Sequence, residues 1–213
     1  MKLIIYDLDG TLVDTLQDIT QAANHMLAQL GLPPKPAEEI RRYIGSGLHE
    51  MVHRCLQTND TRYIQQGAKL YRAFYTQHLL DFSRLYPDAQ AVLDYFKAHR
   101  QAVITNKPNP YSRQILEALG VASYFFRFIA GDEEFPKKPD PAAVQALMRA
   151  AGATPSETVF IGDSLIDIET GRQAGVVTVG IEHGFAENGE LSSADLLVKN
   201  FSSLLEAAKK DRW

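Results

Sequence analysis

The 213-residue chain contains a single cysteine, so it cannot form an internal disulfide bond. Cys55 stands at helical spacing among apolar residues, which favours a packing role over thiol chemistry. The net charge is −4, so there is no basic footprint of the kind that binds nucleic acid. No apolar run is long enough to cross a membrane, and no secretory signal pattern is present. We therefore expect a cytoplasmic protein with neither a nucleic-acid nor a membrane partner.

Internal repeats and low-complexity segments are absent, and the hydrophobic content of 45% is ordinary for a globular protein. From about residue 82 the apolar pattern alternates between expected helices and strands. The expected elements are helix 88–99, strand 102–105, helix 110–119, a strand near 128–130, a helix from Asp140-Pro141 to Gly152, strand 159–162, helix 165–174 and strand 176–181. This alternation predicts an α/β fold, with a Rossmann-like parallel sheet and helices on both faces.

Residues 16–81 differ from the rest, because apolar residues recur there at helical spacing and no convincing strand interrupts them. The apolar run 3–6 precedes this segment and is expected to join the sheet. The sequence therefore predicts a core domain formed by residues 1–15 and 82–213. An all-α domain of residues 16–81 would be inserted just after the first strand.

Two carboxylates follow this first strand directly, in the stretch Asp7-Leu8-Asp9-Gly10-Thr11. Ligands of open α/β sheets bind at the carboxyl ends of the strands. Unpaired buried carboxylates are costly, so we expect a cation beside Asp7 and Asp9. Mg²⁺, which takes oxygen ligands, fits this position. One carboxylate can then act as a nucleophile and the other can transfer a proton.

Three further motifs stand at expected strand ends or helix starts. They are Thr105-Asn106-Lys107-Pro108, Lys138-Pro139-Asp140-Pro141, and Gly162-Asp163-Ser164 followed by Asp167. Together with the first motif, and in this order, they resemble the haloacid dehalogenase-like phosphohydrolases of the helical-cap subfamily, whose cap is inserted where residues 16–81 stand. Over almost its whole length the chain is most similar to the phosphoglycolate phosphatases of that superfamily.

The resemblance implies a role for each motif residue. Asp7 is the expected nucleophile and Asp9 the expected general acid and base, while Lys138 neutralises Asp7 and the phosphoryl group. The expected cofactor is Mg²⁺, and its predicted ligand set is Asp7, Asp9, Asp163 and Asp167, the last in a supporting position. Phosphate contacts are expected at Gly10, at Thr105 and at a backbone or side-chain donor of Asn106.

A small carboxylated substrate such as phosphoglycolate would need a cation for its carboxylate. The sequence offers Arg41, Arg42, Arg54 and Lys107 for this purpose. The turn formed by Gly45, Ser46 and Gly47 is predicted to contact the leaving group, because glycines permit close approach and cap movement. One departure from the resemblance is Glu182-His183-Gly184, since these phosphatases often carry an aromatic residue before the glycine.

Other functions remain open at this point. They are a phosphatase of sugar phosphates, nucleotides or pyrophosphate, a phosphoglucomutase-like phosphotransferase, and a non-catalytic phosphate-binding protein. The pattern His49-Glu50-x-x-His53 is typical of zinc proteases, but zinc would need a third ligand, and no glutamate occurs between Glu50 and Glu117. We expect a small phosphorylated metabolite as the partner of a monomer or homodimer.

Overall fold

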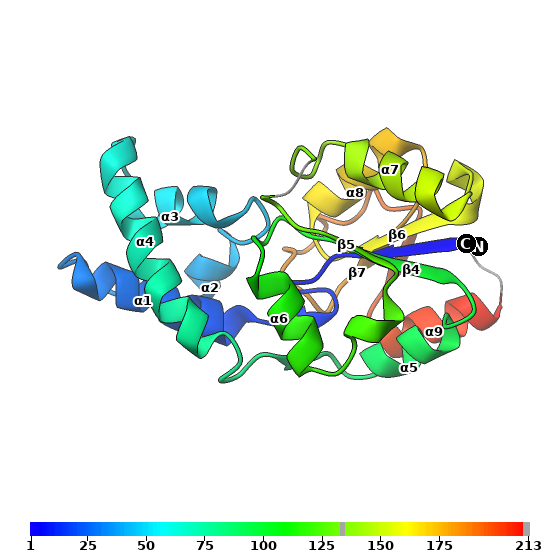
Figure 1. The fold of residues 1–213 in the computed structure, drawn as a ribbon, viewed down its shortest axis with the longest axis horizontal. Coiled ribbons are helices and arrows are strands. Elements are labelled where there is room, and N and C mark those ends of the chain that lie inside the picture. Colours follow the sequence, from blue (N-terminus) through cyan, green and yellow to red (C-terminus); the bar gives the residue numbers. More distant parts are fainter. Residues whose placement is uncertain (133–134, 211–213) are drawn as a thin grey trace.

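The computed structural model describes residues 1–132 and 135–210, which form a six-stranded parallel sheet and a group of helices beside it (Figure 1). The strands lie in the order β5-β4-β1-β6-β7-β8. Their bounds are β1 Leu3–Tyr6, β4 Arg100–Ile104, β5 Arg127–Ile129, β6 Thr158–Gly162, β7 Val177–Ile181 and β8 Leu196–Val198. Strand β1, which is buried along its whole length, is the one that the sequence predicts from four apolar residues in a row, and it pairs with β4 on one side and β6 on the other.

Alternate residues of β1 enter two different hydrophobic layers, as the two-residue period of a strand requires. Leu3 and Ile5 pack with the helices α7 (Ala142–Ala151) and α8 (Leu165–Ala174), whereas Ile4 and Tyr6 belong to the layer of the opposite face. That second layer includes α5 (Ala89–Tyr95), α6 (Tyr111–Ala118) and α9 (Phe201–Lys209). Figure 1 shows α7 and α8 on one side of the sheet and α5 and α9 on the other. The predicted α/β architecture, with helices on both faces, is confirmed.

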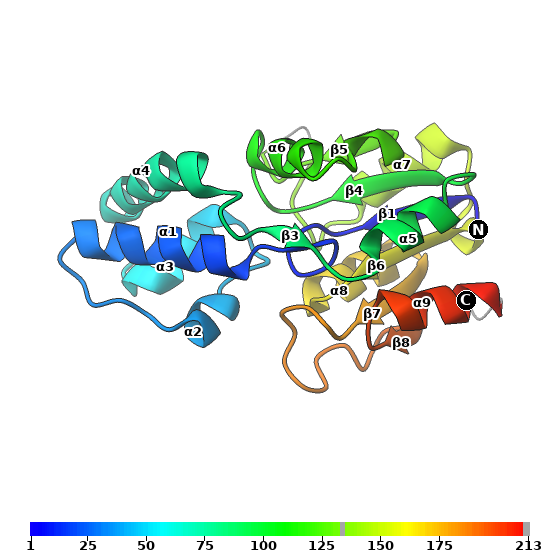
Figure 2. The same cartoon turned by 90° about the horizontal axis from the view of Figure 1, so that it is seen from below.

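Four helices lie beyond the carboxyl ends of the central strands, and Figure 2 shows them as a separate group. They are α1 Leu16–Gln29, α2 Ala37–Arg41, α3 Leu48–Leu56 and α4 Thr61–His78. Met26, Val52 and Tyr75 are among the side chains that bury their apolar faces against one another. Cys55 is buried with them, and burial raises the pKa of its thiol to about 12, which agrees with the expected packing role. We call residues 16–81 the cap below; their status as a separate domain stays a prediction.

The two connections to the cap run side by side. Strand β2 (Val13–Asp14) leads into α1 and pairs antiparallel with β3 (Arg84–Leu85), which returns to the core. Next to this ribbon, the buried carboxylate of Asp18 accepts hydrogen bonds from the backbone N–H groups of Phe82 and Ser83 and from the Ser83 hydroxyl group. The start and the end of the cap are therefore fastened to each other.

The ends of two helices differ from those expected from the apolar pattern, because turns and capping hydrogen bonds decide where these helices end or begin. The expected helix 88–99 ends at Tyr95, and the next residues form turns. Pro141 stands at the N-cap of α7 and not inside it, while Asp140 Oδ1 accepts a hydrogen bond from Ala142 N at 2.8 Å. Across residues 1–132 and 135–210, no helix combines the length and the apolar character that a membrane span requires.

Candidate active site

The four motifs meet at one edge of the sheet. Asp7 follows β1, Thr105 follows β4 and Asp163 follows β6, and these three strands are neighbours in the sheet. Because the strands are parallel, their carboxyl ends all lie at this edge. Lys138 precedes α7, and Asp167 lies in the first turn of α8.

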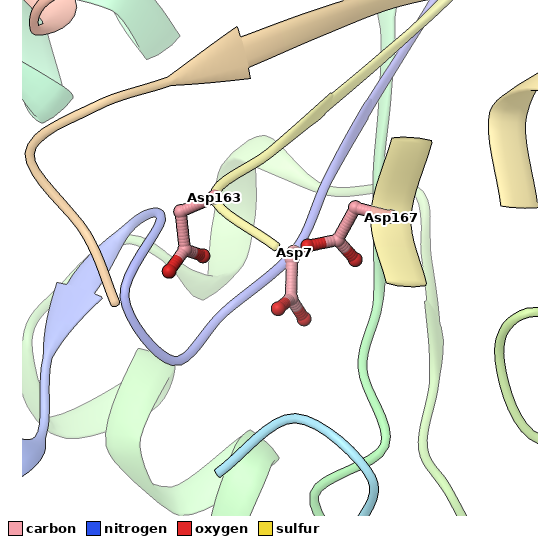
Figure 3. A group of neighbouring side chains, drawn as sticks. All are labelled: Asp7, Asp163 and Asp167. Atoms are coloured by element: carbon pink, nitrogen blue, oxygen red, sulfur yellow. The ribbon is translucent and has the colours of Figure 1, made fainter. Parts of the chain in front are cut away.

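Three buried carboxylates form the centre of the site, at Asp7, Asp163 and Asp167 (Figure 3). One oxygen from each lies within 4.8 Å of the others. Lys138 Nζ is 2.8 Å from Asp7 Oδ1 and 2.6 Å from Asp167 Oδ1, and the lysine side chain is 3% exposed. Asp7 Oδ1 has this ion pair but no hydrogen bond of good geometry to any other part of the described structure.

The crowding of these charges changes their protonation equilibria. Burial raises the pKa of Asp7 from 3.8 to about 7. The attraction of Lys138 opposes this rise, whereas the repulsion of Asp167 and Asp9 adds to it. Burial and the repulsion of Asp167 and Asp7 also raise the pKa of Asp163. Burial opposes the charge of Lys138, but the combined attraction of Asp167 and Asp7 outweighs it and raises the pKa of the ammonium group. The site therefore favours any added positive charge.

Asp163 and Asp167 are held by fixed partners. Asp163 Oδ1 accepts a hydrogen bond from the Thr11 hydroxyl group at 2.6 Å, and Oδ2 accepts one from Phe185 N at 2.7 Å. Asp167 Oδ2 accepts hydrogen bonds from the N–H and hydroxyl groups of Ser164, which forms a capping box at the start of α8. One oxygen of Asp167, Oδ2, thus caps the start of α8, while the other, Oδ1, faces Lys138.

Gly10 permits this arrangement for a reason beyond the expected approach to phosphate. Its φ angle is +84°, and an added Cβ would lie 2.2 Å from Asp163 Oδ2. Such a distance is a severe clash, so a larger residue would displace the Asp163 carboxylate. The glycine is required both by its backbone conformation and by the neighbouring carboxylate.

Asp9 lies outside the three-carboxylate cluster, and its metal role stays a prediction. Its Oδ1 accepts hydrogen bonds from Lys107 Nζ at 2.9 Å and from the Thr15 hydroxyl group at 2.7 Å. Lys107 Nζ is also 3.2 Å from Asp9 Oδ2 and stands 4.7 Å from the centre of the Tyr75 ring. This lysine as the partner of Asp9 was missed by the sequence reasoning, which places it only among four possible cations.

The charges of the site suit a divalent cation. Four carboxylates, at Asp7, Asp9, Asp163 and Asp167, face two ammonium groups, at Lys107 and Lys138. When all four are ionised, two buried negative charges remain, which is costly unless a proton or a cation neutralises them. The cluster of Asp7, Asp163 and Asp167 could therefore bind a metal ion, as its oxygen donors and the poorly satisfied Asp7 Oδ1 indicate.

Thr105 and Asn106 differ in whether their side chains keep a hydrogen-bond donor that a phosphate could use. The buried hydroxyl oxygen of Thr105 accepts a hydrogen bond from Lys107 N at 3.2 Å, so its proton is free to be donated. The Asn106 side chain donates to the carbonyl oxygens of Gly45 and Lys138 and accepts from Lys138 N. It is thus occupied in joining the cap to the Lys138 loop. A phosphate contact at Asn106 stays a prediction for its backbone N–H group only.

A small cavity lies between the cap and the core, beside Asp9 and Lys107. Its volume is about 40 Å³, and its lining includes Gly45 and Gly47 of the predicted turn, whereas Ser46 is not among the lining residues. The φ angles of the two glycines are +110° and +89°, and an added Cβ at Gly47 would lie 2.8 Å from Lys137 Nζ. The turn is therefore brought to the site, and the contact of all three residues with a leaving group stays a prediction.

Two sequence patterns acquire a structural explanation. His183, at the position where related phosphatases often carry an aromatic residue, stacks on Tyr86 with 3.9 Å between the ring centres, and its Nε2 is 3.0 Å from Thr11 O. Glu50 of the zinc-protease pattern accepts a hydrogen bond from Arg54 at 2.9 Å. Over residues 1–132 and 135–210, a potential metal-ligand group forms only at the three aspartates of the site.

We expect added Mg²⁺ to raise the melting temperature more at pH 8 than at pH 5. The folded-state pKa of Asp7, about 7, exceeds the ordinary value of 3.8. Folded protein therefore holds a proton that unfolded protein has lost in this window, and the contribution of Asp7 to stability falls as the pH rises from about 4 to about 7. A cation that binds the deprotonated carboxylates would reverse that loss. Melting curves with EDTA or Mg²⁺ at several pH values test this, and an increment independent of pH would contradict it.

Comparisons with known proteins agree with this geometry. The family model described as haloacid dehalogenase-like hydrolase matches residues 4–181. A phosphoglycolate phosphatase of Neisseria meningitidis serogroup A is 35% identical over 202 residues, which cover 92% of this chain and 86% of the relative. Another, of Vibrio parahaemolyticus, is 33% identical and covers 97% and 95%. The crystal structure of a predicted phosphoglycolate phosphatase from Haemophilus somnus 129PT has a TM-score of 0.92 at 30% identity and covers 98% of both chains.

These similarities extend over both the cap and the core. They confirm the α/β fold and the expected enzyme class, a phosphoric monoester hydrolase. The conclusion from motif order, strand order and overall similarity is that the chain belongs to the haloacid dehalogenase-like hydrolase family.

Proposed function

We propose that this hydrolase cleaves 2-phosphoglycolate to glycolate and phosphate through an aspartyl-phosphate on Asp7, with Mg²⁺ as cofactor. The observation that carries the proposal is the buried Asp7 carboxylate, 2.8 Å from Lys138 Nζ within a cluster of three aspartates at the carboxyl edge of the sheet. A carboxylate so placed is a suitable nucleophile for phosphorus. The two relatives of 33% and 35% identity are phosphoglycolate phosphatases, which supports the choice of substrate.

The proposed reaction has two balanced steps. In the first, an Asp7 oxygen forms a bond to phosphorus, the bond from phosphorus to the leaving oxygen breaks, and that oxygen takes a proton from Asp9. In the second, water attacks phosphorus and gives a proton to Asp9, and the bond between phosphorus and Asp7 breaks. Lys138 and the Thr105 hydroxyl group would stabilise the negative oxygens of the transferring group.

Asp7, Asp163 and Asp167 would hold the Mg²⁺. When bound, the cation would neutralise negative charge on the phosphoryl oxygens and on the nucleophile. The fixed hydrogen bonds of Asp163 and Asp167 would keep these carboxylates in place without reorganisation during the reaction.

The cavity supports a small leaving group. A volume of about 40 Å³ holds about three water molecules, at roughly 10–15 Å³ each. This space suits a compact leaving group such as a two-carbon hydroxy acid better than a sugar or a nucleoside. The walls of the cavity are largely apolar and aromatic, with Tyr71, Tyr75 and Tyr111 among the lining residues. Larger phosphate esters would require the cap to move outward.

The cation for the substrate carboxylate is best assigned to Lys107, because it lines the cavity, whereas the three arginines considered from the sequence are not among the lining residues and have partners elsewhere. Arg41 donates to backbone carbonyl groups of the core, Arg42 pairs with Glu187, and Arg54 pairs with Glu50. Lys107 lines the cavity itself. Its side chain is 6% exposed, so a carboxylate that reached its ammonium group would be bound in a site with little water.

Replacement of Lys107 by glutamine is expected to change substrate preference. The ratio of kcat/KM for 2-phosphoglycolate to that for ethyl phosphate, which lacks the carboxylate, should fall about 30-fold, equivalent to about 2 kcal/mol. The ratio is used because Lys107 also contacts Asp9, and both activities can fall together. Arg54→Gln is the matched control and should leave the ratio unchanged. An unchanged ratio in Lys107→Gln would remove this residue from carboxylate recognition.

Phosphate release from a panel of phosphate esters, with and without Mg²⁺, tests the proposed activity directly. We expect Mg²⁺-dependent release with 2-phosphoglycolate preferred over sugar phosphates, nucleotides and pyrophosphate. Preference for another ester would contradict the proposed substrate but not the proposed phosphatase mechanism. Release from no ester would contradict the phosphatase mechanism. The cytoplasmic location and the monomeric or dimeric state remain predictions from the sequence.

A further inference from the structure

Arg41 crosses from the cap to the core and binds three consecutive peptide groups. Its Nε donates to Phe185 O at 3.1 Å, and its Nη2 donates to Gly184 O at 3.1 Å and to Ala186 O at 3.0 Å. Consecutive carbonyl groups of an extended chain point in opposite directions, so they reach one guanidinium only if the loop is curled around it. The planar, rigid set of donors on arginine thus fixes the shape of the loop 184–186.

The same loop holds a carboxylate of the proposed metal site. Phe185 N donates to Asp163 Oδ2 at 2.7 Å. Gly184 is packed so closely that an added Cβ would lie 2.3 Å from Asp163 Oδ2. Any change in the path of this loop would therefore move or release the Asp163 carboxylate.

A single peptide group connects Arg41 to Asp163. The carbonyl group of Gly184 and the N–H group of Phe185 belong to one planar unit. Arg41 binds the oxygen of that unit, and Asp163 binds its hydrogen. A hydrogen bond donated to the carbonyl oxygen polarises the peptide and strengthens its N–H group as a donor. The orientation of Asp163 is in this way connected to a residue of the cap.

We propose that Arg41 is a positioning residue that couples closure of the cap to the metal affinity of Asp163, through the peptide group between Gly184 and Phe185. The inference rests on the proposed function, in which Asp163 is a ligand of Mg²⁺. When the cap is closed, the loop is held and Asp163 is oriented. When the cap opens, Arg41 withdraws and the affinity for the cation falls. By linkage, bound Mg²⁺ favours the closed cap to the same extent.

The neighbouring residue Arg42 provides a matched control. It lies next to Arg41 at the end of α2 and reaches the same region of the core, where its Nε is 2.6 Å from Glu187 Oε1. The pair is a largely exposed ion pair, with 65% and 63% of the two side chains accessible. Within the described residues, Arg42 makes no hydrogen bond or ion pair with the Gly184–Phe185 peptide group. Replacement of either arginine by glutamine removes one positive charge from the same edge of the cap.

Isothermal titration calorimetry with Mg²⁺ alone, without substrate, tests the coupling. We expect Arg41→Gln to raise the Kd for Mg²⁺ at least about fivefold, because outer partners of metal ligands change affinity by about 10–100-fold when removed directly. Arg42→Gln should stay within about twofold of the wild type. Arg41→Lys keeps the charge but lacks the planar set of donors, so its Kd should be intermediate.

The outcomes separate this inference from the function on which it rests. An equal Kd in the wild type and in a folded Arg41→Gln variant, or equal increases in both glutamine variants, would overturn the coupling. If Arg41→Gln does not fold, Arg41→Lys decides, and a wild-type Kd in that variant would also overturn it. Failure of the wild type to bind Mg²⁺ at all would instead overturn the proposed metal site.

Discussion

Replacement of Asp7 by asparagine is expected to reduce Mg²⁺-dependent phosphate release by at least about 10⁴-fold and to raise the melting temperature of the metal-free protein. The amide is a poor nucleophile, so the covalent step is lost. The same change removes one of the three buried carboxylates of the cluster, of which two, Asp7 and Asp167, pair with Lys138, and the raised pKa of Asp7 indicates that its charge is disfavoured there. A gain of about 1 kcal/mol would raise the melting temperature by about 2–4 °C.

This combination of lost activity and increased stability distinguishes a catalytic group from a structural one. Phosphate release and thermal melting in EDTA measure the two effects, and mass spectrometry excludes conversion of the asparagine back to aspartate. Asp81→Asn is the control, since Asp81 is a surface carboxylate paired with His78, and it should leave turnover unchanged. A loss of less than about tenfold in Asp7→Asn would rule out Asp7 as the nucleophile.

Replacement of Lys138 by methionine is expected to destabilise the protein by about 3–5 kcal/mol and to abolish turnover. The ammonium group lies between Asp7 and Asp167, and its side chain is 3% exposed. Without it, those carboxylates stay buried with no cation from the chain itself. The melting temperature in EDTA should fall by roughly 10 °C. Denaturant unfolding gives the free energy, and phosphate release gives the activity.

Lys137→Met is the matched control for this experiment. The two lysines are adjacent in the sequence and of the same type, but Lys137 is exposed whereas Lys138 is buried. We expect the melting temperature of Lys137→Met to change by less than about 2 °C. Equal destabilisation by both replacements would show that the ion pairs of Lys138 contribute little to stability.

The sequence predicts best those elements whose ends carry clear chemical signals. The run 3–6 matches β1 residue for residue, because four apolar residues stop at Asp7. Helix 165–174 matches α8, which begins after the capping residue Ser164 and ends at Gly175 in a left-handed conformation. The ribbon of β2 and β3 has only two residues in each strand, and β8 has three, so their patterns are too short to detect.

The residues of the site were predictable as a set because the motifs follow neighbouring parallel strands. Which side chains of the set contact one another could not be predicted from the sequence. Lys107 and Asn106 follow Thr105 in one short loop, yet one side chain reaches Asp9 and the other reaches Gly45 in the cap. Side-chain directions after the end of a strand depend on the path of the loop and not on periodicity. The size of the cavity depends equally on how the cap packs against the core.

The central position of β1 has a consequence for biosynthesis. Leu3 pairs with Arg100 in β4 and with Thr158 in β6, so β1 leaves the ribosome long before its two partner strands are made. At about 5–20 residues per second, β6 is complete roughly 8–30 seconds after β1. The contacts between α1 and α4 span a shorter stretch of chain and can form earlier. The helical insertion is therefore expected to fold before β1 is joined by its neighbours in the sheet.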